Sequence, residues 1–357
     1  MTLPARGPVS ARLSADDTRL SIIVDTNRQN RHVLPGTVST GGGAKLGLHH
    51  DHTIVADRPR AIAGLWGRRT HPPMPLIWDS LFIGLLQASP LILAAMGFTL
   101  IYYLNGFMNI AYAETITLGA YSALLFNVVL GLGFYLAIIP SALLSGAISV
   151  AVYLLIFRPA LNRGVQPTEM IILSVGVSFM LRYALVLLAG ADNLYLREPP
   201  ITYLSFLGQG ATNLQLIALV LVALVAIALT AMIYRTRLGE QMRGLANNHD
   251  LAVASGINPH QTSVVIWFVA GCAGGLAGVF SGIFSAVTPY MGWNMILVTI
   301  MVSIVAGIGS VKGAVVASIA AGVLTAFVTL ITVPLHADVF LLLAFIAVLG
   351  FRKVAQV

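Results

Sequence analysis

The side chains best suited to chemistry in this chain are ionisable groups placed inside apolar sequence. Glu114 and Arg182 each lie within an apolar stretch, and Asn105 and Asn109 come shortly before the glutamate. A charge inside a membrane is costly, so it usually faces the protein interior or a water-filled path. The chemistry that these groups suit is therefore charge pairing or contact with a polar solute.

Four interpretations of this group remain open. Glu114 and Arg182 form a structural salt bridge, or Arg182 snorkels or caps a neighbouring helix end. Alternatively, Glu114, Asn105 and Asn109 lie at a broken helix beside a translocation path, where half-helix ends offer dipoles to a zwitterionic solute. In the fourth interpretation Arg182 contacts a substrate carboxylate directly.

The sequence predicts neither a catalytic site nor a metal site. The apolar segments contain no histidine cluster, no Ser-His-Asp set and no paired aspartates, so an enzyme is not expected. His49, His50 and His52 could bind a metal, but a flexible tail is the favoured interpretation. The single cysteine, Cys272, excludes a disulfide framework. The GIGSVKG stretch lacks the spacing of a phosphate loop, so no cofactor is expected in this chain.

Composition indicates that the bilayer is the solvent of this protein. The chain is 57% hydrophobic and 9% charged, whereas about a quarter of the residues of a soluble domain are charged. Several apolar stretches approach the roughly 20 residues that cross a bilayer as a helix. The predicted fold class is all-α, a polytopic helical membrane protein.

The pattern predicts about eight or nine apolar segments. They run over residues 80–103, 108–130, 134–157, 169–190, 213–234, 263–285, 294–309, 314–334 and 337–351. The second segment begins with the polar stretch NIAYAET. We therefore expect one re-entrant or broken element near 105–120.

Two parts of different character are expected along the chain. Residues 1–75 are predicted to be a disordered N-terminal extension, because they are rich in Arg, Gly and Pro and show no sustained periodicity. Met74 would be a natural start, so this extension is expected to be dispensable or an artefact of start-site choice. Residues 76–357 are predicted to be the transmembrane domain, with a cytoplasmic loop at 235–262.

Basic residues in the short loops predict the orientation, because such residues favour the cytoplasmic side. They are Arg158, Arg163, Arg235, Arg237, Arg243, Lys312, Arg352 and Lys353. From residue 158 onward, all of them can be cytoplasmic, and so can the C-terminus. The basic N-terminal tail does not fit this orientation, because three apolar segments precede residue 158 and would place the tail on the side opposite to Arg158. Either the tail lies outside or one early segment fails to cross the membrane, and the second interpretation is favoured. The net charge of +7 arises mostly from the tail, so nucleic-acid binding is not expected.

Glycines spaced four residues apart predict close helix packing. They are Gly271, Gly274, Gly275, Gly278 and Gly282. In a membrane helix such a strip lets another backbone approach closely.

The longest polar stretch between two apolar segments predicts two short helices. Leu238, Met242 and Leu245 form one apolar stripe. Asn247, Asn248 and Asp250 are suited to cap a second helix, LAVAS, which Gly256 would end and Pro259 would prevent from continuing. Helices this short are not stable alone in water, so they persist only if they dock into something. Two interpretations remain: the helices dock into a groove of a cytoplasmic partner, or the stretch is a solvated loop that only connects two spans.

Several stretches resemble the branched-chain amino acid permease family of ABC importers. TRLGEQMRGLANNHDLAVASGINPHQT is similar to the family's cytoplasmic coupling loop, GFTLIYYLNGFMNIAYAETITLGAY to its early region, and FVAGCAGGLAGVFSG with GIGSVKGAVVAS to its late helices. Tyr112 and Ala113 replace the usual His-Gly before the glutamate. The resemblance implies coupling residues in the loop: Arg237, Gly239, Glu240, Arg243, Asp250, Ala252, Gly256 and Ile257.

The resemblance also implies a division of labour in a bacterial inner membrane. The chain would form the translocation path for branched-chain amino acids or a related small polar solute. Cytoplasmic ATPase subunits would bind ATP, a periplasmic binding protein would capture the solute, and a second permease subunit or a copy of the chain would complete the pore. The alternative is a stand-alone channel or secondary transporter for a small solute.

Overall fold

The computed structural model describes residues 11–16, 19–24, 47–48, 54–55, 76–200, 202–206, 209–307, 309–331 and 334–354. The chain divides into two units, Met1–Pro73 and Met74–Val357.

The first unit contains a small antiparallel sheet. Its strands, in the spatial order β1-β2-β4-β3, are β1 Ala11–Asp16, β2 Arg19–Val24, β4 Ile54–Val55 and β3 Gly47–Leu48. Most of residues 1–75, including His49, His50 and His52, lie outside the described residues. Disorder of this extension stays a prediction.

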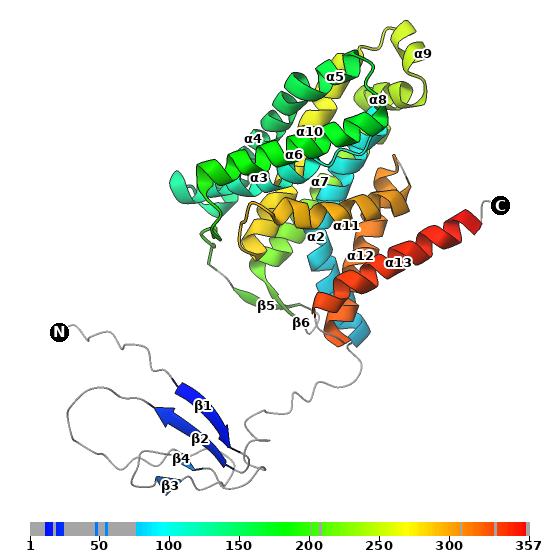
Figure 1. Ribbon diagram of the computed structural model, residues 1–357. Helices are drawn as coiled ribbons and strands as arrows, with labels where there is room; N and C mark the ends of the chain where they lie inside the picture. Colours follow the sequence, from blue (N-terminus) through cyan, green and yellow to red (C-terminus); the bar gives the residue numbers. More distant parts are fainter. Residues whose placement is uncertain are drawn as a thin grey trace. The chain divides into compact units, whose positions relative to one another are not determined.

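Helices make up nearly all of the second unit, which confirms the all-α fold class (Figure 1). The elements are α2 Leu76–Asn105, α3 Tyr112–Leu124 with π-helix η1 Leu125–Val129, α4 Phe134–Val152 with η2 Tyr153–Phe157 and α5 Arg158–Asn162, α6 Pro167–Ala189, α7 Asn213–Arg235, α8 Arg237–Asn247, α9 His249–Ala254, α10 Pro259–Phe284, α11 Met291–Ala306, α12 Val311–Ile331 and α13 Pro334–Val354. Each expected apolar segment corresponds to one of these helices.

Length and composition identify the membrane-crossing helices of the described part. Six are long and apolar enough to span a bilayer: Leu81–Asn105, Phe134–Asn162, Pro167–Ala189, Asn213–Arg235, Pro259–Phe284 and Val311–Leu330. Shorter apolar helices cover Met291–Ala306 and Val339–Gly350. The protein is therefore a multi-pass membrane protein.

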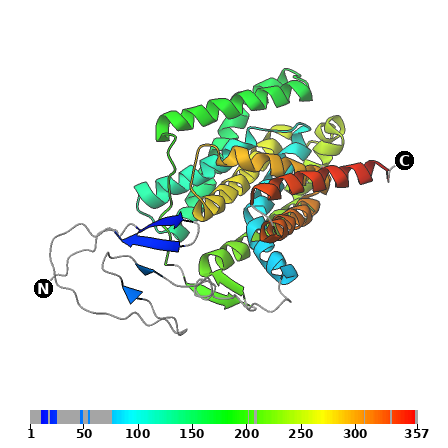
Figure 2. The ribbon, with the colours of Figure 1, turned by 60° about the horizontal axis from the view of Figure 1, so that its bottom comes forward.

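The core of the second unit forms around α2, α3 and α10. α2 packs against α12 and α10, and α10 also packs against α3 and α4. Most of α2 and α10 is buried, whereas most of α6 and α7 faces outward. α6 crosses the front of the bundle in Figure 1, and the turned view of Figure 2 shows the same green helix at the outer edge of the bundle.

The helical backbone is interrupted between α2 and α3, close to the position where the sequence predicted a break. Helical backbone stops at Asn105 and resumes at Tyr112, with Gly106 in the left-handed region at φ 72°. α3 then continues to the opposite end of the bundle, where Asn127 Oδ1 accepts the Arg197 N–H at 2.7 Å. The interruption therefore lies between the first two expected segments, and the helical backbone within the second segment is continuous from Tyr112 to Val129. Because α2, α3 and α4 alternate in direction, α2 begins at the end opposite Arg158.

One element was not expected from the sequence. Strands β5 Tyr203–Phe206 and β6 Gln209–Thr212 form a hairpin in the connection between α6 and α7, with Tyr203 opposite Thr212. Thr212 then caps α7 by accepting the Gln215 N–H at 3.2 Å. The hairpin lies at the end of the bundle opposite α8 and α9 (Figure 1).

Candidate functional site

The polar loop between α7 and α10 folds into the two short helices α8 and α9. The hydroxyl of Thr236 accepts the Gly239 N–H at 3.3 Å, which caps the first turn of α8. Met242 and Leu245 are buried, and Leu238 packs against the core. The apolar stripe thus seats α8 on α7, α2 and α10, and this packing holds a helix that would be unstable alone.

Caps define the second helix and the start of the next span. Asn248 Oδ1 accepts a backbone N–H from the first turn of α9 at 3.0 Å. Gly256 adopts φ 88° just beyond this helix. Asn258 caps α10, and Pro259 occupies its first turn. The apolar segment was predicted to begin at residue 263, but α10 begins four residues earlier, at Pro259. The reason is that the fixed φ of proline suits the first turn of a helix.

Four of the eight expected loop residues face the protein. They are Gly239, Arg243, Ala252 and Ile257. A Cβ on Gly239 would lie 2.0 Å from the Ile233 carbonyl oxygen. Arg243 donates a hydrogen bond to the same oxygen, and its guanidinium lies 6.0 Å from the centre of the Tyr234 ring. These contacts fix α8 against the end of α7.

The other four are exposed and free to meet a partner. They are Arg237, Glu240, Asp250 and Gly256. Beside them α9 exposes Leu251 and Val253, at 64% and 42%. The sequence did not single out these two because the apolar stripe it showed belongs to α8. No signal for them was available in the sequence, because a helix of six residues is too short to show which of its faces is buried.

Glu114 and Arg182 form a buried ion pair between α3 and α6. The carboxylate Oε1 accepts hydrogen bonds from Arg182 Nη2 at 2.5 Å and Nε at 3.1 Å, and from Ser178 Oγ at 2.8 Å. The two side chains are 2% and 4% exposed. Burial together with three donors on one oxygen makes this a structural contact that holds α6 to α3.

Aromatic rings surround the guanidinium of Arg182. Its central carbon lies 4.6 Å from the ring centre of Trp293, 5.5 Å from Phe179 and 5.7 Å from Tyr290. Ring faces attract a cation most strongly where water is excluded. The ion pair therefore also joins α6 to the α11 region.

Neither Asn105 nor Asn109 is among the hydrogen-bond partners of the ion pair in the described residues. Asn105 Nδ2 donates to the Ile101 carbonyl at 3.1 Å, and the residue lines a cavity at the α8 end together with Leu245 and His249. Asn109 lies in the break between α2 and α3 and is 2% exposed. The structure therefore pairs Glu114 with Arg182, whereas Asn105 and Asn109 line two different cavities.

A small polar cavity lies at the break. Asn109 Oδ1, Ser149 Oγ and Trp267 Nε1 are buried, and none has a hydrogen-bond partner among the described residues. All three residues line one cavity of about 10 Å³, room for roughly one water molecule, and apolar side chains form most of the rest of its wall. Asn109 was predicted from the sequence, whereas Ser149 and Trp267 were not, because they come from α4 and α10.

The glycine strip of α10 lies against α3 and α4. A Cβ on Gly278 would lie 1.8 Å from the Ile116 carbonyl oxygen, and one on Gly275 would lie 2.6 Å from Ser145 Cβ. A Cβ added at Gly271 would contact Ser149 and Gly146, and one at Gly274 would contact Tyr112. At Gly282 the added Cβ would contact Val287, Ala120 and Leu196. Backbone contact this close requires residues without a Cβ.

Gly278→Ala is expected to destabilise the protein by about 1–3 kcal/mol, because the added methyl group forces α3 and α10 apart. Gly176→Ala is the matched control, since nothing lies within 4 Å of a Cβ at this α6 position. Thermal unfolding of both purified variants in the same detergent measures the difference. Equal melting temperatures would contradict close packing at Gly278.

Among the described residues, no group of three or more His, Cys, Asp or Glu side chains is placed to hold a metal ion. The groups that the structure does bring together are a buried ion pair, a polar cavity and an exposed two-helix loop.

Comparison with known proteins gave one family. Residues 80–349 match the model described as branched-chain amino acid transport system, permease component. A solved structure of PsaBC from Streptococcus pneumoniae in complex with Fab is 17% identical, covers 80% of this chain and 94% of that chain, and has a TM-score of 0.40. No curated protein matches.

Proposed function

The chain belongs to the family of branched-chain amino acid transport permease components, and we propose that it is the permease subunit of an ATP-driven ABC importer. Its role is transport, and ATP would be bound and hydrolysed by a partner subunit. The solute is proposed to be a branched-chain amino acid or a similar small polar molecule.

The observation that carries this proposal is the outer surface of α8 and α9. The inner side of the loop is fixed to the bundle through Gly239 and Arg243. The outer side offers the apolar side chains of Leu251 and Val253 next to exposed charges. A short rigid element with an apolar tip and a charged rim suits the groove of a partner protein. We propose that this partner is the ATPase.

Charge supports a cytoplasmic location for this end of the bundle in a bacterial inner membrane. Arg158, Asn258 and Leu245 line one cavity, so the loop after α4 and the loop containing α8 and α9 share an end. This end carries Arg158, Arg163, Arg235, Arg237, Arg243 and Lys312. The connection after α6 at the opposite end carries one arginine and two acids, Asp192, Arg197 and Glu198. Excess positive charge favours the cytoplasmic side.

A chain of aromatic contacts could carry movement from α9 to the helix break. α9 leads directly into α10, where Trp267 lies 5.1 Å from both Tyr153 and Phe157, measured between ring centres. Phe157 stacks on Phe107 at 5.6 Å, and Phe107 lies inside the break. A push on α9 would therefore reach the break through packed rings.

We propose that the transported solute contacts the protein at the polar cavity beside the interruption between α2 and α3. Unpaired buried polar groups cost about 1–3 kcal/mol each, so Asn109, Ser149 and Trp267 are suited to a polar guest. A cavity of about 10 Å³ is too small for an amino acid. Solute contact would require α3, α4 and α10 to separate during the transport cycle.

Other subunits are proposed to complete the importer. A second permease subunit, homologous or identical, would form the other wall of the path. A periplasmic binding protein would deliver the solute to the end that carries the β5–β6 hairpin. The binding protein would contribute most of the selectivity.

Photo-crosslinking tests the docking surface. A photoreactive residue at Leu251 in the full chain, expressed in its native cells, is expected to crosslink to an ATPase identified by mass spectrometry. Leu130 is the matched control, because it is 59% exposed in the connection between α3 and α4 at the opposite end. A crosslink at both positions, or at neither, would argue against docking through α9.

A further inference from the structure

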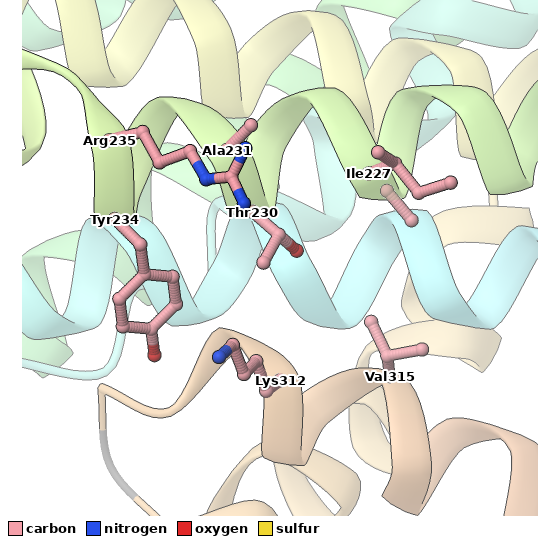
Figure 3. Close-up of a pocket in the computed structure, with 8 residues that line it drawn as sticks. Ile227, Thr230, Ala231, Tyr234, Arg235, Lys312 and Val315 are labelled. Carbon is pink, nitrogen blue, oxygen red and sulfur yellow. The ribbon is translucent and has the colours of Figure 1, made fainter.

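A groove between the end of α7 and the start of α12 has the chemistry of a lipid site. It has a volume of about 440 Å³ and is lined by Ala226, Ile227, Thr230, Ala231, Tyr234, Arg235, Lys312 and Val315. At one end of the groove, Figure 3 shows Lys312 of α12 beside Tyr234, and the Arg235 side chain lying along α7 over Ala231 and Thr230 on the opposite side. The other end of the groove is apolar.

Both cations are available for an anionic ligand. Arg235 and Lys312 are exposed, and within the described ranges neither has a carboxylate at salt-bridge distance. Lys312 Nζ lies 4.6 Å from the centre of the Tyr234 ring, which holds the ammonium at the mouth of the groove. The eight lining residues are apolar, hydroxyl-bearing or cationic. Lys312 also lies in the first turn of α12, where the helix dipole adds positive potential.

Apolar surface continues from the groove along α7. Val220, Leu224 and Ile227 recur at helical spacing and are 60–67% exposed. Val316 on α12 is 68% exposed beside the groove residue Val315. A ligand with a long apolar part and a negative head would match this surface along its whole length.

We propose that the groove binds an anionic phospholipid, with its phosphate between Arg235 and Lys312 and an acyl chain along α7. Basic pockets between membrane helices bind anionic headgroups, and a tyrosine at this depth is typical of the membrane interface. The cations select the phosphate, and the apolar track distinguishes a lipid from a free phosphate ion. This inference does not depend on ATPase docking.

Native mass spectrometry of the purified full chain measures the binding. Phosphatidylglycerol is expected to bind the wild type more tightly than phosphatidylcholine with the same acyl chains. Arg235→Gln/Lys312→Gln is expected to weaken phosphatidylglycerol binding roughly 25-fold, about 5-fold for each cation. Arg158→Gln/Arg163→Gln is the control, since it removes two positive charges at the same end but away from the groove.

Three results would overturn the proposal. They are unchanged phosphatidylglycerol affinity in the groove variant, equal affinity of the wild type for the two lipids, and full displacement of phosphatidylglycerol by millimolar inorganic phosphate. If the double variant fails to fold, Ala231→Trp provides the test, because it fills the apolar part of the groove and leaves both cations. It should weaken phosphatidylglycerol binding, and unchanged binding would count against the site.

Discussion

Arg182→Met is expected to destabilise the protein by about 3–5 kcal/mol, because it leaves a buried carboxylate without its cation. Glu114 Oε1 would keep only the hydrogen bond from Ser178. The contact between α6 and α3 would weaken, since the ion pair joins a largely exposed helix to the core. Unfolding of the purified variant by titration with a denaturing detergent measures the loss.

Two further variants identify the cause of that loss. Arg197→Met removes an exposed arginine from the connection after α6 and should change stability by less than about 0.5 kcal/mol. Adding Glu114→Gln to Arg182→Met removes the unpaired charge and should recover part of the stability. If Arg182→Met were as stable as Arg197→Met, the buried pair would not hold α6 in place.

Gly239→Ala is expected to uncouple ATP hydrolysis from uptake. The new Cβ would lie 2.0 Å from the Ile233 carbonyl oxygen, so α8 must shift away from the end of α7. A strain of about 1–3 kcal/mol at this contact corresponds to a factor of about 5 to 150 in an equilibrium constant, so we expect solute uptake per ATP to fall by roughly fivefold or more. The measurement is the ratio of uptake to ATP hydrolysis in proteoliposomes that contain the copurified ATPase.

Gly244→Ala on the same helix is the control for this prediction. A Cβ there would lie 3.4 Å from Ile257 Cδ1, which is ordinary contact, so coupling should stay near the wild-type ratio. Normal coupling in both variants would mean that the contact between α8 and α7 has no part in coupling ATP hydrolysis to solute uptake. Loss in both would indicate that α8 tolerates no change at its glycines.

Much of the fold could be predicted from the sequence, because the bilayer imposes length and apolarity on each span. The break was visible as the polar stretch before Glu114. Residues 203–212 gave no clear signal of pairing, and the hairpin appeared only in the structure. The start of α10 was placed too late because Pro259 was interpreted only as the end of α9.

The candidate site was harder to predict, because its contacts join residues that are distant in sequence. Glu114 and Arg182 are 68 positions apart, and their pairing depends on the adjacency of α3 and α6. Ser149 and Trp267 meet Asn109 only through the packing of α4 and α10 around the break. For Leu251 and Val253, a helix of six residues is too short for its sequence to show which face is buried.

ATP-dependent uptake into proteoliposomes tests the central claim most directly. The full chain, reconstituted with its copurified ATPase and with a binding protein loaded with labelled branched-chain amino acid, is expected to accumulate solute only with ATP on the α8–α9 side. Leu251→Glu/Val253→Glu should abolish this uptake, whereas Asn247→Asp, which adds a negative charge to the same loop, should retain it. Flux through the chain alone, or uptake unaffected by the double substitution, would contradict the claim and favour a stand-alone channel or secondary transporter.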